Sequence, residues 1–246
     1  MRVAAISDIH GNLFALEAVL EDIARHDADM VLNLGDNLAG PMDPRGVCDL
    51  LMGADFPSVR GNHDRVLVMP KPGKEYGPID AFAQEQLELP QLTWLSQLPE
   101  TLSVPEIFLC HGTPQSDAAP WLDRFWSGRT ATYPDHDEVA ALADGLDFPV
   151  MLCGHTHLSR VVRLRDDRMV VNPGSVGVQF NHGAPDARYA LLERRPGGWT
   201  ASLRSVPYDH EAAARQAEAN GFPGWRLALT TGWVGPEGLF STPRAG

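Results

Sequence analysis

The sequence predicts an α/β fold in which two β-sheets pack face to face and helices cover the outside. Residues 2–59 alternate strand-like and helix-like segments, which is typical of parallel strands joined by right-handed crossovers. Residues 107–206 instead carry short apolar β segments, which we expect to pair as a meander in a second sheet. No clean boundary separates the two halves, so we expect one domain over residues 1–246.

The elements of the first half are indicated by apolar periodicity and by capping residues. Expected strands cover residues 2–6 and 58–59, and another strand begins at residues 30–32 and ends at Gly35-Asp36. Asn12 is a good N-cap for the first helix, in which leucines recur at helical spacing. Asp43-Pro44 combines an N-cap with a proline at the first helical position, so a second helix begins there. This βαβαβ order implies a parallel sheet whose functional groups gather beyond the carboxyl ends of its strands.

The second half is expected to be mainly β, with a helix before and after it. Apolar runs predict strands at residues 107–110, 150–153, 161–164, 169–171, 189–193 and 201–206. Residues 82–98 and 209–219 are predicted to be helical. We expect residues 112–135 to form a long loop or cap, and the Gly- and Pro-rich chain from about residue 235 to form a loose tail.

The composition excludes several classes of function. The formal net charge is −12 and the isoelectric point is near 5.1, which argues against an extended nucleic-acid surface. No apolar run approaches the roughly 20 residues that span a membrane, and no signal peptide precedes the first strand. The three cysteines form no CxxC motif and suit core packing. We therefore expect a cytoplasmic protein with no membrane partner, and its oligomeric state stays open.

Five short polar motifs follow apolar runs at or near the expected strand ends. They are Asp8-Ile9-His10, Gly35-Asp36, Gly61-Asn62-His63-Asp64, His111-Gly112 and Gly154-His155-Thr156-His157. Each motif alone has a structural alternative, such as an Asp turn or a polar loop that satisfies its own backbone. Together they bring carboxylate, amide and imidazole groups to several strand ends, and they predict one site for two metal ions.

The spacing within the motifs indicates how their side chains share the site. Asp8 and His10 are two residues apart, so we expect both on one side of the strand end, where they can bind one dication. The same spacing predicts that His155 and His157 face one cluster. The Asp36 carboxylate has enough lone pairs to bridge two metals. The mixed nitrogen and oxygen ligands suit Mn, Fe, Co, Ni or Zn better than Ca, and we favour Mn.

In identity and order, the motifs resemble those of the calcineurin-like metallophosphoesterase superfamily. The resemblance covers residues 8–157 and implies a four-layer αββα sandwich of two mixed β-sheets flanked by helices. It also implies one metal held by Asp8, His10, Asp36 and His157, and a second held by Asp36, Asn62, His111 and His155, with Asp36 as the bridge. His63 would act on the leaving group, and Asp64 would orient His63.

A closer likeness is to the small bacterial and archaeal branch that begins Asp-Ile-His-Gly-Asn, as residues 8–12 do here. The loop of residues 172–177, Asn-Pro-Gly-Ser-Val-Gly, also matches this branch, whose members resemble phosphodiesterases or dinucleoside polyphosphate hydrolases. Two positions depart from the pattern. Phe180 and Gln115 stand where related sequences often carry Arg. Both departures remove a cationic group from the expected substrate site.

The resemblance implies a hydrolase that cleaves phosphodiester or nucleotide-derived phosphoanhydride bonds. Two dications would lower the pKa of a bridging water, and the resulting hydroxide would attack phosphorus in line. Two alternatives remain at this point. One is a phosphoprotein or phosphomonoester phosphatase, and the other is a non-catalytic metal-binding scaffold of the same fold.

Substrate contacts are expected beside the metal ligands and from the loop of residues 112–135. The candidates are Asn37, Trp121, Arg124, Trp126 and Arg129. Aromatic and arginine side chains in one loop can stack on a nucleobase and hold a phosphate. The alternative is that the tryptophans only bury an irregular cap. The expected partner is a small phosphorylated molecule such as a nucleotide.

Overall fold

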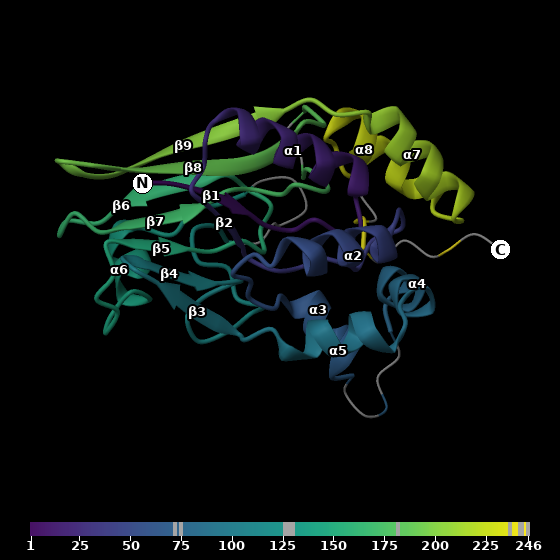
Figure 1. Cartoon of the computed structure of the whole chain (residues 1–246), viewed down its shortest axis with the longest axis horizontal. Helices are drawn as coiled ribbons and strands as arrows, with labels where there is room; N and C mark the ends of the chain where they lie inside the picture. Colours follow the sequence, from purple (N-terminus) through teal and green to yellow (C-terminus); the bar gives the residue numbers. More distant parts are fainter. Residues whose placement is uncertain are drawn as a thin grey trace.

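The structure, a computed structural model, describes residues 1–70, 73, 76–124, 131–180, 183–235, 238–240 and 244 of the chain. Two β-sheets lie one above the other in Figure 1, with helices on their outer sides and at one end. Each sheet contains both parallel and antiparallel pairs. The expected α/β fold with two mixed sheets is therefore confirmed.

The first sheet has four strands in the order β2-β1-β8-β9. They are β1 (Arg2–Ile6), β2 (Met30–Asn33), β8 (Ala187–Arg195) and β9 (Gly198–Val206). β1 and β2 are parallel, as a crossover through the first helix requires, and Val3 pairs with Met30. β8 runs antiparallel to β1, with Ala4 opposite Leu191. This sheet therefore joins segments from both ends of the chain.

The second sheet has five strands in the order β3-β4-β5-β7-β6. They are β3 (Thr101–Val104), β4 (Ile107–Cys110), β5 (Val150–Leu152), β6 (Arg160–Arg163) and β7 (Met169–Asn172). The central strands β4, β5 and β7 are parallel, whereas β3 and β6 are antiparallel edges. Parallel pairing brings the carboxyl ends of the central strands to one edge of the sheet.

The helices begin at the residues that the capping chemistry indicates. They are α1 (Leu13–Arg25), α2 (Pro44–Ala54), α3 (Asn62–Val68), α4 (Pro78–Gln86), α5 (Leu89–Gln97), α6 (His136–Ala141), α7 (His210–Ala219), the 3₁₀ turn η1 (Pro223–Trp225) and α8 (Arg226–Thr231). Asn12 Oδ1 accepts from Ala15 N–H at 3.1 Å, and Asp43 Oδ1 accepts from Gly46 N–H at 2.8 Å, so both expected N-caps are confirmed. Among the helices of the described residues, none is long and apolar enough to cross a lipid bilayer.

Alternate side chains of each strand pack into different layers. Val3 and Ala5 of β1 join Leu109 of β4 in the apolar cluster between the two sheets. Ala4 and Ile6 of β1 belong to the cluster that also contains α1 and α2. A further cluster joins the outer face of the second sheet to α6. The layers therefore follow the order helix, sheet, sheet, helix.

Three expectations about the elements differ from the structure. β8 and β9 pair with β1 in the first sheet, so the later β segments do not all form one meander. Residues 58–59 form a single bridge, between Ser58 and Asn33, rather than a strand. The helix expected at 82–98 is divided into α4 and α5, because Pro90 cannot donate the backbone hydrogen bond that a continuous helix needs.

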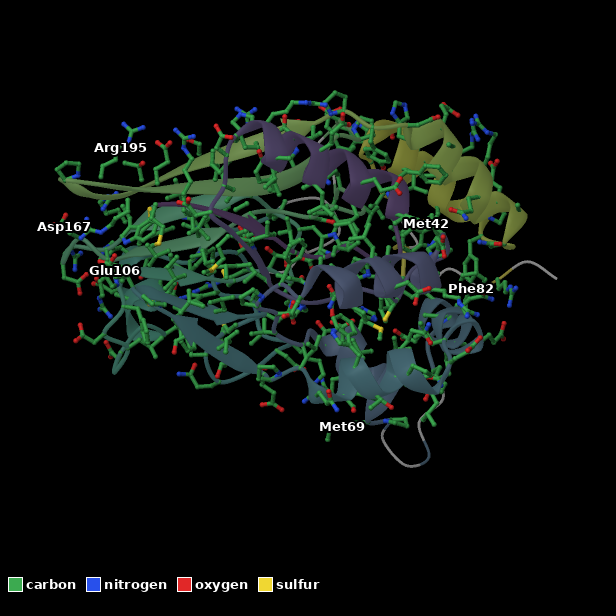
Figure 2. The ribbon with its side chains drawn as sticks, in the orientation of Figure 1. Met42, Met69, Phe82, Glu106, Asp167 and Arg195 are labelled. Atoms are coloured by element: carbon green, nitrogen blue, oxygen red, sulfur yellow. The ribbon has the colours of Figure 1, made fainter. Side chains whose placement is uncertain are left out.

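The molecule has two distinct ends. Glu106, Asp167 and Arg195 mark one end in Figure 2, where the chain begins and the β8–β9 hairpin turns. Met42 and Phe82 mark the other end, near α2, α4 and α7. Because β1 runs away from the N-terminus, the residues that follow it lie toward this second end.

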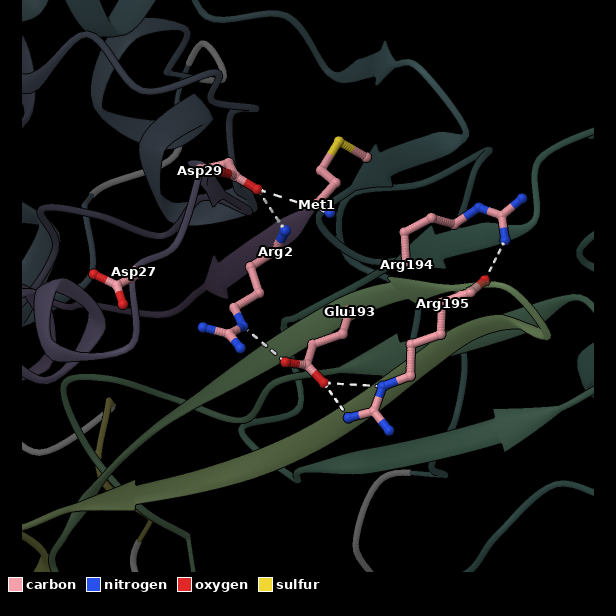
Figure 3. Close-up of a pocket in the computed structure, with 7 residues that line it drawn as sticks. All are labelled: Met1, Arg2, Asp27, Asp29, Glu193, Arg194 and Arg195. Carbon is pink, nitrogen blue, oxygen red and sulfur yellow. Dashed lines mark hydrogen bonds and ion pairs between the residues drawn. The ribbon is translucent and has the colours of Figure 1, made fainter.

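A surface hollow of about 450 Å³ lies at the first end, beside the start of β1 (Figure 3). Its charged groups pair with one another: Arg2 Nε lies 2.7 Å from Glu193, and the N-terminal amine lies 4.0 Å from Asp29. Arg195 also pairs with Glu193. The hollow is a surface network of ion pairs, separated by the length of β1 from the polar motifs.

Candidate metal centre

The polar motifs meet where the strands of both sheets end. Asp8 follows β1 and Asp36 follows β2 in the first sheet. His111 follows β4 and His155 follows β5 in the second sheet. Gly154 N–H donates to His111 O at 2.6 Å, which ties the two loops of the second sheet together. The site therefore occupies the carboxyl ends of strands from both sheets, as the sequence predicts.

Two groups of side chains bring their potential ligand atoms together. The first cluster consists of Asp8, His10 and His157, and the second cluster consists of Asp36, His111 and His155. Within each cluster, the ligand atoms lie within 4.8 Å of one another. The clusters adjoin, because Asp8 Oδ1 of the first lies 3.9 Å from His111 Nε2 of the second. Each cluster can hold one cation.

The two histidines of the last motif belong to different clusters. The spacing alone indicated that His155 and His157 face one cluster, which is wrong, because neither residue is extended. Their φ values are +69° and +60°, and this left-handed backbone breaks the alternation of a strand. The division that the family resemblance implied, with His157 at one metal and His155 at the other, matches the two clusters. Asp8 and His10 do share the first cluster, as expected, although their φ values of +54° and +49° are left-handed too.

Left-handed backbone recurs among the candidate ligands. It occurs at Asp8, His10, Asp36, His155 and His157. Asp and His adopt this conformation more readily than most residues, but each such position still costs roughly 1–3 kcal/mol when it is strained. Strain of this kind persists only where the surrounding structure holds it, and it gathers at functional sites.

Three imidazoles are held so that Nε2 faces the clusters. The Nδ1 atoms of His10, His111 and His157 lie 2.6, 2.7 and 2.8 Å from the carbonyl oxygens of Ala39, Leu34 and Val178. A carbonyl only accepts, so each Nδ1 carries a ring proton, and Nε2 is the atom that can offer a lone pair to a cation. Histidines that bind metals are oriented by bonds of this kind.

The donor atoms fit divalent cations. The Nε2 atoms of His10 and His157 face each other across 3.2 Å. Burial lowers the pKa of both rings, that of His10 to about 4, so neither carries an extra proton at neutral pH. Two lone pairs at this distance repel each other unless a cation lies against both. Among the described residues, Asn62 Oδ1 is a buried acceptor without a hydrogen-bond partner, which suits a further ligand.

The buried carboxylates carry charge that a cation would balance. Burial raises the pKa of Asp8 to about 7, and the Asp36 charge adds to the shift. Although burial opposes it, the nearby His111 and His63 hold the pKa of Asp36 well below its usual range. His111 Nε2 lies 3.1 Å from Asp36, and the carboxylates raise the pKa of His111 to about 10 against the effect of burial. Bound dications would take the place of these protons.

His63 stands beside the clusters, and its ring meets a carboxylate that the sequence did not indicate. Its Nδ1 lies 2.8 Å from Oδ1 of Asp80, which is buried in the first turn of α4. Burial would lower the pKa of His63, but Asp36 and Asp80 outweigh it and raise that pKa to about 9. Asp64 was expected in this place. As the third residue of α3, it reaches back to the start of that helix and to Asn37 instead.

The candidates from the loop of residues 112–135 do not reach the clusters where the structure describes them. Trp121 is buried and its indole N–H donates to Val139 O at 3.1 Å, so the packing alternative holds for this residue. Arg124 is exposed and pairs with Glu138 on the surface. Trp126 and Arg129 lie outside the described residues.

Asn37 is buried among the loops rather than open to a substrate. Its Nδ2 donates to Asp64 at 2.9 Å, and its Oδ1 accepts from Asn33 at 2.7 Å. Its backbone N–H also donates to Asp64 at 2.9 Å. The side chain therefore holds the loops after β2 and before α3 together.

Three side chains at the site were not predicted from the sequence. They are Asp80, Phe180 and Phe240. The Phe180 ring stacks on His157, with 4.2 Å between ring centroids and 5° between planes. The only indication in the sequence was that Phe180 stands where related sequences often carry Arg. Acidic residues are common in the first turn of a helix, because they stabilise its N-terminus, so the sequence around Asp80 does not indicate a functional role.

The comparisons with known proteins agree with this geometry. Residues 1–195 match the model of the calcineurin-like phosphoesterase superfamily domain. An uncharacterized protein of Methanocaldococcus jannaschii is 26% identical over 250 residues, covering 91% of this chain and 94% of that protein. A metallophosphoesterase from Sphaerobacter thermophilus is 28% identical, with a TM-score of 0.71 over 93% of this chain and 98% of that one. A hypothetical protein of Pyrococcus horikoshii OT3 shares the fold, with a TM-score of 0.78, 19% identity, and 95% and 99% of the chains covered.

Gly61→Ala is expected to weaken metal binding. A Cβ at Gly61 would lie 2.1 Å from Asp36 Oδ1 and 2.4 Å from the Asp36 nitrogen, so the Asp36 loop must move. We expect metal affinity to fall roughly 10- to 100-fold, the range seen when the surroundings of ligands are disturbed. Titration with a metal indicator measures it. Gly53→Ala is the matched control, because a Cβ there meets nothing within 4 Å. Unchanged affinity in Gly61→Ala would contradict this account of the loop.

Metal affinity is also expected to fall as the pH falls. The raised pKa of His111, about 10, means that a cation displaces its proton at neutral pH. Below about 7, Asp8 is protonated as well, so a second proton competes. As the pH is lowered toward 7, the metal affinity should therefore fall by about tenfold per pH unit. Below pH 7 it should fall more steeply. Calorimetric titration in buffers of different ionisation enthalpy counts the released protons. An affinity that is constant between pH 5.5 and 8 would rule out this coupling.

Proposed function

The chain belongs to the calcineurin-like phosphoesterase superfamily, and we propose that it uses two metal ions to cleave phosphodiester or phosphoanhydride bonds in small, nucleotide-like substrates. Membership of this family makes the chain a metal-dependent phosphoesterase. The observation that carries the two-metal proposal is the pair of adjoining clusters, which offers a separate set of ligand atoms to each of two cations.

The proposed ligands divide between two ions that share one carboxylate. Asp8, His10, Asp36 and His157 would hold one ion, and Asp36, Asn62, His111 and His155 would hold the other. When bound, two dications lower the pKa of water and offset the charge that develops on the phosphoryl oxygens. The mixed nitrogen and oxygen donors support Mn, Fe, Co, Ni or Zn, and Mn is our choice among them.

His63 is the proposed general acid. Its Nδ1 is engaged by Asp80, so Nε2 is the ring atom left to donate a proton to the leaving oxygen. Asp36 and Asp80 favour the imidazolium form that this role needs. Asp80 acts through His63, as a positioning residue that fixes the ring and supports its charge. Acid catalysis of this kind contributes about 10²- to 10⁴-fold in rate.

Phe180 supports a substrate of low charge. It packs flat on His157 at the site, in a position where sequences of this branch often carry Arg. A phosphomonoester dianion is usually held by additional cations, whereas a phosphodiester carries one charge fewer. An aromatic face can also stack on a nucleobase. The lower charge favours diesters over monoesters, and the aromatic face favours nucleotide-derived groups, whether they are esters or anhydrides.

The metal requirement provides the first test of this proposal. The purified protein should contain close to two transition-metal ions per chain, and chelation should abolish hydrolysis of bis-4-nitrophenyl phosphate. Asp36→Asn should lower both metal content and activity, because the shared carboxylate is lost, whereas Asp166→Asn, on an exposed turn, should leave them unchanged. The proposal would be refuted if elemental analysis finds no metal in the protein and a chelator does not change its activity. Faster turnover of 4-nitrophenyl phosphate would favour a phosphomonoesterase instead.

The acid role of His63 predicts how two variants respond to the leaving group. His63→Ala should keep its metal but lose about 10²- to 10⁴-fold in kcat, with a larger loss for alkoxide than for nitrophenolate leaving groups. Asp80→Asn should shift the alkaline limb of the pH–rate profile to lower pH. The sign follows because Asp80 raises the pKa of His63 and the protonated ring is the active form. Loss of metal in His63→Ala, or an unmoved limb in Asp80→Asn, would show that these roles are assigned wrongly.

A further inference from the structure

An aromatic side chain from the C-terminal segment lies against the histidines of the site. The centroid of the Phe240 ring is 4.8 Å from that of His10, 5.2 Å from that of His63 and 5.8 Å from that of His157. Phe180 is its neighbour at 5.4 Å. Ring separations of this size are van der Waals contact. Phe240 therefore takes up space beside both the first cluster and the candidate acid.

The segment that carries Phe240 is attached on the side of α7 and α8. We call residues 238–240 and 244 the strap. Leu239 is buried in the same apolar cluster as Phe222 and Trp225, and Phe240 itself contacts Trp225 at 5.7 Å between ring centroids. Family similarity by the domain model ends at residue 195, so this part of the chain lies beyond the residues that the model matches.

A second attachment ties the strap to α4. The Arg244 guanidinium lies over the ring of Phe82 at 5.1 Å and pairs with Glu85 at 2.9 Å. Its Nε also donates to Asn220 O at 3.0 Å. Phe82, labelled in Figure 2, belongs to α4, which Figure 1 shows at the same end of the molecule. The Arg244 and Glu85 side chains are 43% and 58% exposed, so solvent weakens their ion pair and this attachment can open.

These contacts place an apolar ring directly beside the candidate acid and the first cluster. The leaving oxygen must reach His63, and the organic group that it carries then competes with Phe240 for the space next to that ring. We infer that Phe240 determines specificity by limiting the bulk of the ester group that reaches the metal centre, and that the strap must open for larger groups. This inference rests on the proposed function of the site.

The inference is tested with a graded series of substrates. Methyl aryl phosphodiesters, whose leaving phenols have matched pKa but increasing ring size, separate bulk from reactivity. In Phe240→Ala, kcat/KM should rise about tenfold or more for the largest aryl group and little for the smallest, because a pocket discriminates by about 10- to 200-fold on small changes in bulk. Arg244→Ala should act in the same direction, since it loosens the strap at a distance. An equal change for all sizes, or none, would overturn the inference.

The matched control is another arginine whose ion pair is exposed. Arg165, which follows β6, pairs with Asp137 in the first turn of α6, and both side chains are 74% exposed. Arg165→Ala should leave the dependence on aryl size as it is in the unmodified protein. If it changes this dependence as much as Arg244→Ala does, the effect is not that of the strap, and the inference fails.

Access to the metal gives a readout that needs no hydrolysis. EDTA is a bulky chelator, so the metal-loaded protein should lose its ions to EDTA faster in Phe240→Ala and Arg244→Ala than in the unmodified protein or Arg165→Ala. Phe240→Leu, which keeps an apolar group on His10, should lie between. Unchanged rates of metal loss in all variants would overturn the inference that the strap limits access. If the variants lose metal faster but the protein hydrolyses no phosphoester, the proposed function is refuted, while the inference that the strap limits access to the metals is retained.

Discussion

Two buried imidazole nitrogens that face each other across 3.2 Å are the contact on which this site depends. The Nε2 lone pairs of His10 and His157 repel each other at this distance, and a cation that lies against both would remove that repulsion. The ring protons of both residues are committed to carbonyl oxygens on the other side. Those carbonyls belong to the loops that follow β2 and β7, and the Gly177 N–H bond to Asp8 O, 3.0 Å long, ties the second of these loops to the first cluster. The positions of the ligands therefore depend on the conformation of these loops.

The rigid part of the molecule keeps these strained loops in place. The first sheet supplies Asp8 and Asp36, the second supplies His111 and His155, and the apolar cluster between the sheets sets the separation of the two sets. Left-handed backbone is costly, and it is tolerated here because each loop is short and is fastened at both ends by strands or helices. A site built on strand ends in this way is more precise than one built on free loops.

Elements outside the shared motifs modify what the centre can do. Asp80 reaches His63 from α4, which the chain inserts between the third and fourth motifs. Phe180 and Phe240 add apolar walls, the second of them from beyond the residues that the family model matches. The metal-binding core carries the hydrolytic chemistry of the family. In our proposal, Asp80 sets the charge of His63, and the two phenylalanines limit the space beside it.

The sequence by itself determined the features that depend only on residues close together in the chain. They are the strands 2–6 and 107–110, the N-caps Asn12 and Asp43, and the polar motifs at strand ends. These features depend on periodicity and capping over a few residues, so local chemistry is enough to predict them. The tertiary structure alone decided that β8 and β9 join β1, that Trp121 is core, and that Asp80 and Phe240 reach His63. The family resemblance already implied that His155 and His157 serve different metals, but only the tertiary structure shows how each ring is aimed, by left-handed backbone and by partners far along the chain, such as His10, 147 residues away from His157. No local pattern encodes a contact of that kind, since it exists only once both sheets have packed.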